Sequence, residues 1–103
     1  MDFKALLAAT KTIAVVGMSN RPERPSFVVA SVMQQGGYRI IPVNPVAASS
    51  GATILGEPVY ATLQEAARHA SIDVVDVFRN SDGVPPIAQE AIAIGARALW
   101  LQL

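Results

Sequence analysis

The stretch Ile13-Ala-Val-Val-Gly-Met-Ser-Asn-Arg-Pro-Glu-Arg-Pro-Ser26 decides the fold of this chain. Residues 13–16 are all apolar, which is typical of a strand that is buried on both faces of a sheet. Gly17 permits a tight turn, and a polar loop with two arginines follows it. Ser26 stands before residues 27–33, an apolar stretch of helical length, so we expect Ser26 to be the N-cap of a helix. A strand, a glycine turn and a helix N-terminus form the phosphate-binding start of a doubly wound α/β domain.

Strands and helices alternate along the rest of the chain. This alternation implies right-handed crossovers and a parallel sheet. We therefore predict one α/β domain over residues 1–103, a doubly wound parallel sheet in which the first strand is central. Its two neighbours in the sheet are expected to be the strands at 38–43 and 72–78. In chain order, the expected elements are a helix at 2–10, a strand at 13–17, a helix at 26–35, strands at 38–43 and 72–78 with a short helix from 62 to 69 between them, a helix from 85 to 94 and a strand at 97–103.

Three local patterns add detail to this layout. Residues 46–53 are small and weakly polar, and we expect them to form a mobile loop. Thr62 and Glu65 have the spacing of a capping box, so a helix should begin after Thr62. Asp73 and Asp76 lie three apart in a strand and therefore point to opposite faces. We expect Asp73 to lie far from the ligand edge of the sheet, and Asp76 to lie near the site or to hydrogen-bond a neighbouring loop.

Composition argues against several classes of function. The chain has 8 Lys and Arg against 8 Asp and Glu, so it lacks the basic surface of a nucleic-acid-binding protein. It contains no cysteine, which excludes disulfides, thiolate metal sites and a cysteine nucleophile and fits a reducing cytoplasm. The N-terminus does not resemble a signal peptide, and no apolar run approaches the roughly 20 residues that span a bilayer. We expect a cytoplasmic protein that binds neither nucleic acid nor membrane.

The candidate site lies where the carboxyl ends of the strands meet. Three polar loops converge there, at residues 17–26, 44–45 and 78–80. Arg24 and Arg79 are the candidate charges, because a guanidinium group donates two hydrogen bonds at once to a phosphate. The sequence thus predicts an anion site at this edge of the sheet.

The motifs of catalytic and dinucleotide sites are absent. A dinucleotide fingerprint needs three glycines and an acid after the second strand, but only Gly17 is present and the second strand ends in Val43-Asn44. No Walker A lysine follows the first strand. His69 is the single histidine, without an acid cluster, so we predict neither a metal site nor a nucleophilic triad. We expect no catalytic residues beside the anion site.

Four segments spread over the whole chain form a further pattern. They are Val15-Val-Gly-Met-Ser-Asn-Arg-Pro-Glu-Arg-Pro-Ser26, Ile41-Pro-Val-Asn-Pro45, Asp73-Val-Val-Asp-Val-Phe-Arg79 with Val84-Pro85, and Ala98-Leu-Trp-Leu-Gln-Leu103. In this order and spacing they resemble the small bacterial and archaeal CoA-binding proteins. The domain of that family is similar to the CoA-binding domain of the succinyl-CoA synthetase α subunit and of ADP-forming acyl-CoA synthetases. The resemblance implies a Rossmann-like fold with coenzyme A as its ligand.

The resemblance also implies a role for individual residues. Asn44 and Pro45 would border the adenosine, and Phe78 and Arg79 would line the other side of the nucleotide. Family members usually continue past the last strand with a glycine turn, a helix and a strand, so we expect a domain that is shortened at its C-terminus. The residues that would hold the phosphates of CoA are Gly17, Ser19, Asn20, Arg24, Pro25 and Ser26.

Several functions are compatible with this pattern. The leading hypothesis is a non-catalytic protein that binds CoA or an acyl-CoA. One alternative is a CoA-handling domain or subunit of an acyl-CoA synthetase, which would work with a ligase-type partner protein. Others are a regulator or scaffold that senses CoA, and an NAD(P)-binding regulator with a Rossmann fold. A homo-oligomer is compatible with the hydrophobic fraction of 51%.

Overall fold

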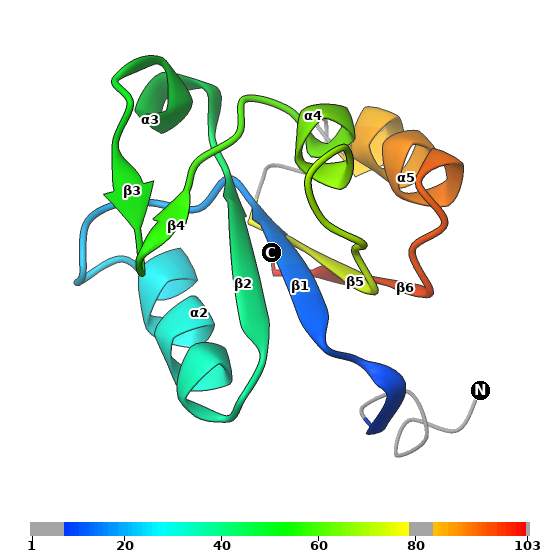
Figure 1. Ribbon diagram of the computed structural model, residues 1–103, viewed down its shortest axis with the longest axis horizontal. Coiled ribbons are helices and arrows are strands. Elements are labelled where there is room, and N and C mark those ends of the chain that lie inside the picture. The colour runs from blue at the N-terminus through cyan, green and yellow to red at the C-terminus, as the bar shows by residue number, and fades with distance from the viewer. Residues whose placement is uncertain (1–7, 79–83, 103) are drawn as a thin grey trace.

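A parallel sheet forms the centre of the fold (Figure 1). The computed structural model describes residues 8–78 and 84–102. Within them the sheet has the order β2-β1-β5-β6, and every neighbouring pair is parallel. β1 is central, with β2 on one side and β5 on the other, so the predicted arrangement is confirmed. The four strands are β1 (Thr12–Val16), β2 (Arg39–Val43), β5 (Val74–Val77) and β6 (Ala98–Leu101).

Helices cover both faces of this sheet (Figure 1). α2 (Pro25–Gln35) lies on one face, and α4 (Leu63–Ala67) and α5 (Val84–Ala93) lie on the other. Alternate residues of β1 enter the two cores: Ile13 and Val15 pack on the α2 side, and Ala14 and Val16 pack on the opposite side. All four are at most 3% exposed, which explains why this strand is apolar without alternation. The predicted doubly wound, Rossmann-like class is confirmed. Of the helix expected at 2–10, residues 2–7 lie outside the described residues, and residues 8–9 are helical.

The expectation of a mobile loop over residues 46–53 is wrong. The chain forms the short helix α3 (Pro45–Ser49) there. The side-chain oxygen of Asn44 accepts hydrogen bonds from the amides of Val46 at 2.9 Å and Ala47 at 3.2 Å, so Asn44 is the N-cap. An asparagine cap followed by proline is a strong helix start, because proline lacks the amide hydrogen that would be unsatisfied there anyway.

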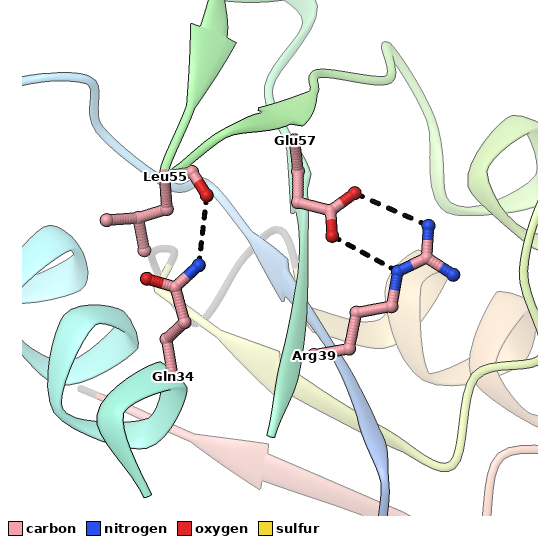
Figure 2. A network of polar contacts seen from close by, with 4 residues as sticks. All are labelled: Gln34, Arg39, Leu55 and Glu57. Atoms are coloured by element: carbon pink, nitrogen blue, oxygen red, sulfur yellow. Dashed lines mark hydrogen bonds and ion pairs between the residues drawn. The ribbon is translucent and has the colours of Figure 1, made fainter. Parts of the chain in front are cut away.

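A small hairpin follows α3 and lies against the edge of the fold beside β2 (Figure 1). Its strands are β3 (Thr53–Ile54) and β4 (Glu57–Pro58), joined by a two-residue turn with positive φ at both residues. Figure 2 shows how side chains attach it to the domain. The Gln34 amide donates to the carbonyl of Leu55 at 2.9 Å, and Arg39 forms a two-pronged ion pair with Glu57 at 3.1 and 3.3 Å. The hairpin is therefore tied to both α2 and β2.

Two helix starts test the capping predictions. The Thr62 hydroxyl accepts the amide of Glu65 at 3.1 Å, so the predicted N-cap of α4 is confirmed. The prediction for Ser26 is wrong: α2 begins at Pro25, and Arg24 occupies the N-cap position. Proline at the first helical position moves the start one residue earlier and releases the Ser26 hydroxyl for another contact.

Within the described part of the chain, no helix is long and apolar enough to cross a membrane.

Candidate anion-binding site

A cleft of about 340 Å³ lies at the carboxyl edge of the sheet, and we call it the anion cleft. It is formed by the loop from β1 to α2, the first residue after β2 and the first residue after β5. Eight of the ten residues expected at the site line it: Gly17, Ser19, Asn20, Arg24, Pro25, Ser26, Asn44 and Phe78. Of the other two, Pro45 lines a neighbouring hollow, and Arg79 lies outside the described residues. The structure therefore gathers these residues, while their role in binding stays a prediction.

Gly17 turns the chain out of β1 and into the cleft. Its φ of 81° lies in the left-handed region, which glycine adopts without steric strain. Its amide still donates to the carbonyl of Val43 at 2.9 Å, so the turn begins in register with β2. The next side chain, Met18, is fully buried in the core beneath α2. The base of the loop is thus anchored on both sides.

Two serine hydroxyls face the cleft as potential donors. The Ser26 hydroxyl oxygen accepts the amide of Ser19 at 2.9 Å, and the Ser19 hydroxyl oxygen accepts the amide of Arg21 at 3.1 Å. A serine hydroxyl has one hydrogen and two lone pairs, so an oxygen that accepts from the backbone can still donate its own hydrogen. The loop therefore supports its backbone with the serine oxygens, and each of these hydroxyls keeps one hydrogen that it can donate.

The N-terminus of α2 adds positive charge to the cleft. Among the described residues no side-chain hydrogen bond caps it, and the amides of Ser26 and Phe27 lie too early in the helix to meet a helical carbonyl. The helix dipole places partial positive charge at this end, and the exposed guanidinium of Arg24 stands beside it. Because none of the described residues that line the cleft is acidic, the site is suited to an anion.

A second hollow of about 330 Å³ adjoins the anion cleft on the opposite face of the sheet. Val16 and Pro45 line it, and each is next in sequence to a residue of the anion cleft. Sequence reasoning missed this hollow, because its wall depends on how α4 and α5 pack and no local motif signals that. It is lined by Val16, Val43, Pro45, Ala61, Thr62, Leu63, Pro86, Ile87 and Glu90.

The two aspartates of the third main strand lie outside both clefts. The Asp73 carboxylate accepts the amides of Lys11 at 2.9 Å and Thr12 at 3.0 Å, at the amino end of the sheet. Partial burial acts to raise its pKa, but these two hydrogen bonds, together with the charges of Arg97 and Lys11, outweigh it and lower the pKa overall. The predicted distance of Asp73 from the ligand edge is confirmed.

Asp76 is fully buried in β5, and among the described residues no hydrogen bond of good geometry reaches its carboxylate. Residues 79–83, which follow this strand, lie outside the described residues, so the expected place near the site or bond to a neighbouring loop stays a prediction. In register it lies between Val15 of β1 and Trp100 of β6. Burial raises the pKa of this carboxyl, and the nearby Gln102 side chain opposes the shift only in part.

The single histidine lies away from the anion cleft. His69 is an exposed residue just after α4, and its ring stacks on Tyr60 with 5.1 Å between centroids. Among the described residues, no group of three or more His, Asp or Glu side chains could hold a metal ion.

The fold and the cleft define a class of protein. A Rossmann-like sheet with a glycine turn and a donor-rich helix start at its carboxyl edge is a nucleotide-binding type of domain. A family model described as "CoA binding domain" matches residues 11–103. This chain belongs to that CoA-binding domain family.

The chain is also similar to individual proteins. The chain is 41% identical over 101 residues to the uncharacterized protein YneT of Bacillus subtilis, a match that covers 98% of this chain and 70% of YneT. The structure of cell-free ID.343 from Thermus thermophilus has a TM-score of 0.88 and 34% identity, over 98% of this chain and 72% of that one. A more distant likeness is the structure of RSP in complex with beta-NADH, with a TM-score of 0.71 and 19% identity over 91% of this chain and 46% of RSP. At that identity the likeness to RSP concerns the fold alone.

Proposed function

We propose that this chain binds coenzyme A or an acyl-CoA, and that it holds the phosphates in the anion cleft without catalysing a reaction on them. The observation that carries the proposal is the chemistry of the cleft lining. Serine hydroxyls, the first amides of α2 and Arg24 line the cleft, and none of the lining residues that the structure describes carries a carboxylate. Membership of the CoA-binding domain family supports CoA as the source of the anion.

The residues present fit the chemistry of CoA. Its diphosphate and its 3′-phosphate are strong acceptors, which match the Ser19 and Ser26 hydroxyls and the first amides of α2. Arg24 is exposed at the helix start, where its guanidinium can reach a phosphate from the solvent side. The uncharged parts of the ligand would then extend from the cleft over the adjoining apolar surfaces.

Titration calorimetry of the full chain with CoA, acetyl-CoA, NADH and NADP tests the proposal. We expect CoA or acetyl-CoA to bind more tightly than either nicotinamide nucleotide, since the loop lacks the glycines and the ribose-binding acid of a dinucleotide site. Tighter binding of NADH than of CoA would contradict the proposal. Formation of an acyl-CoA from ATP, CoA and a carboxylic acid by the isolated chain would contradict its non-catalytic part.

Cytoplasmic localisation, a homo-oligomer, a ligase-type partner and the similarity to succinyl-CoA synthetase stay predictions of the sequence. The titration with CoA does not distinguish a binding protein from a subunit of an acyl-CoA synthetase, because both would bind CoA. Assays of acyl-CoA formation with and without an added ligase subunit would separate these two roles.

A further inference from the structure

One peptide group of the anion cleft is held at both of its ends by side chains. The carbonyl of Met18 accepts a hydrogen bond from the Asn44 amide nitrogen Nδ2 at 2.8 Å. The amide of the following residue, Ser19, donates to the Ser26 hydroxyl at 2.9 Å. Asn44 begins α3 and Ser26 lies in α2, so two separate helices fix this one peptide group.

Fixing both ends sets the direction of the loop. A peptide group is planar and its C=O and N–H point in opposite directions, so two partners on opposite sides stop the plane from rotating. The buried Met18 side chain anchors the residue on one side of this plane. The fixed peptide plane determines how the next residues, Ser19 and Asn20, are oriented. It therefore also determines which of their groups face the cleft.

The hydrogen-bonding capacity of Asn44 is nearly exhausted by these internal contacts. Its Oδ1 accepts from two amides of α3, Val46 and Ala47, which uses both lone pairs, and one Nδ2 hydrogen goes to Met18. The partners also settle which end is oxygen, because backbone amides need an acceptor and the Met18 carbonyl needs a donor. Asn44 borders the cleft, yet little of its side chain remains for a ligand.

We infer that Asn44 is a positioning residue: it couples the start of α3 to the anion loop by holding the Met18–Ser19 peptide group in the orientation that the anion requires. The inference rests on the proposed function for the identity of the ligand, but the coupling itself exists in the ligand-free chain. The first amides of α3 bind Oδ1 of Asn44 and thereby hold its Nδ2 in place to donate to Met18.

The test is the substitution Asn44→Ser, because a serine hydroxyl can still cap α3 but has no amide to donate to Met18. The matched control is Ser49→Ala, which removes a side-chain hydrogen bond of 2.8 Å inside the same helix and leaves the clamp intact. Affinity for CoA and for inorganic pyrophosphate is measured by calorimetry. Amide chemical shifts and hydrogen exchange are measured by NMR without ligand.

For Asn44→Ser we expect both ligands to bind about tenfold more weakly, as for the loss of one well-placed hydrogen bond, with a thermal midpoint close to that of the control. In the ligand-free variant, the Ser19 amide should shift and exchange faster, whereas the Val46 and Ala47 amides should stay protected. Unchanged Ser19 exchange would overturn the inference, and weaker binding with an unchanged ligand-free loop would instead make Asn44 a direct ligand contact. If the wild type bound no CoA, the proposed function would fail, while the exchange of Ser19 would still decide for or against the clamp.

Discussion

The two ends of the central sheet differ in the acceptors that they offer to backbone amides. At the amino end, the Asp73 carboxylate accepts the amides of Lys11 and Thr12, so the chain supplies an anion to its own donors. At the carboxyl end, the serine hydroxyls, the first amides of α2 and Arg24 surround a cleft whose described lining residues include no acid. Similar donors thus meet an internal acceptor at one end, whereas at the other end we propose that they meet a ligand. We interpret the difference as the division between a structural and a binding edge.

Removing the positive charge of Arg24 at the binding edge should have the largest effect on CoA affinity. Arg24→Ala should weaken CoA binding by about 1–3 kcal/mol, because a charge-assisted contact to phosphate is lost. Arg21→Ala is the matched control, since Arg21 lies in the same loop but outside the cleft lining. Calorimetry on both variants measures the effect. Equal affinities for Arg24→Ala and the wild type would remove this guanidinium from the site and weaken the contrast between the two edges.

Removing the charge of the structural edge should change stability and leave CoA affinity unaltered. Asp73→Asn should lower the free energy of unfolding at pH 7 by about 1 kcal/mol, because the amides of Lys11 and Thr12 lose an ionised acceptor. The folded-state pKa of Asp73 is lowered, so its contribution is present above the unfolded pKa of about 3.9 and is lost as the pH falls through the folded value. Urea unfolding between pH 2 and pH 7 should show the two proteins converging in acid. A constant difference across that range would be inconsistent with this role.

Asp76 should respond to pH in the opposite sense. Its folded-state pKa is raised by burial, so its contribution to stability is greatest below the unfolded pKa of about 3.9 and declines as the pH rises through the folded value. Asp76→Asn keeps the shape and removes the ionisable group, and we expect a thermal midpoint a few degrees higher at pH 7. The advantage should vanish near pH 4. A variant that is less stable than the wild type at pH 7 would show that a partner of Asp76 compensates the buried acid.

The centre of the fold could be predicted because its signals are local and strong. The continuous apolar run in β1 indicates burial on both faces, and Gly17 marks the turn that its φ of 81° requires. Alternation of strands and helices then determines the parallel order with β1 in the middle. For the same reason the loops that converge on the anion cleft could be identified before the structure was known.

The wrong predictions concern residues whose hydrogen-bond partners are distant in sequence, or whose neighbours favour a different local structure. Ser26 looks like a helix cap in sequence, but Pro25 determines the helix start, and the hydroxyl bonds the amide of Ser19 instead. In the sequence we interpret Asn44-Pro45 as the beginning of a loop because small residues follow, whereas in the structure the pair is the N-cap and first residue of α3. The second hollow and the contact from Asn44 to Met18 depend on packing across 26 and more positions in sequence, which no local pattern encodes.

The most direct test of the account is an NMR titration of the full chain with CoA, followed through its backbone amides. We predict that the largest shifts occur in the loop from Gly17 to Phe27 and at the start of α3, and that the amides of Lys11 and Thr12, already bonded to Asp73, stay unchanged. Inorganic pyrophosphate should shift the same loop amides, because the anion is the group that the cleft recognises. The account would be contradicted if CoA left this loop unperturbed, or if its main effect fell at the amino end of the sheet.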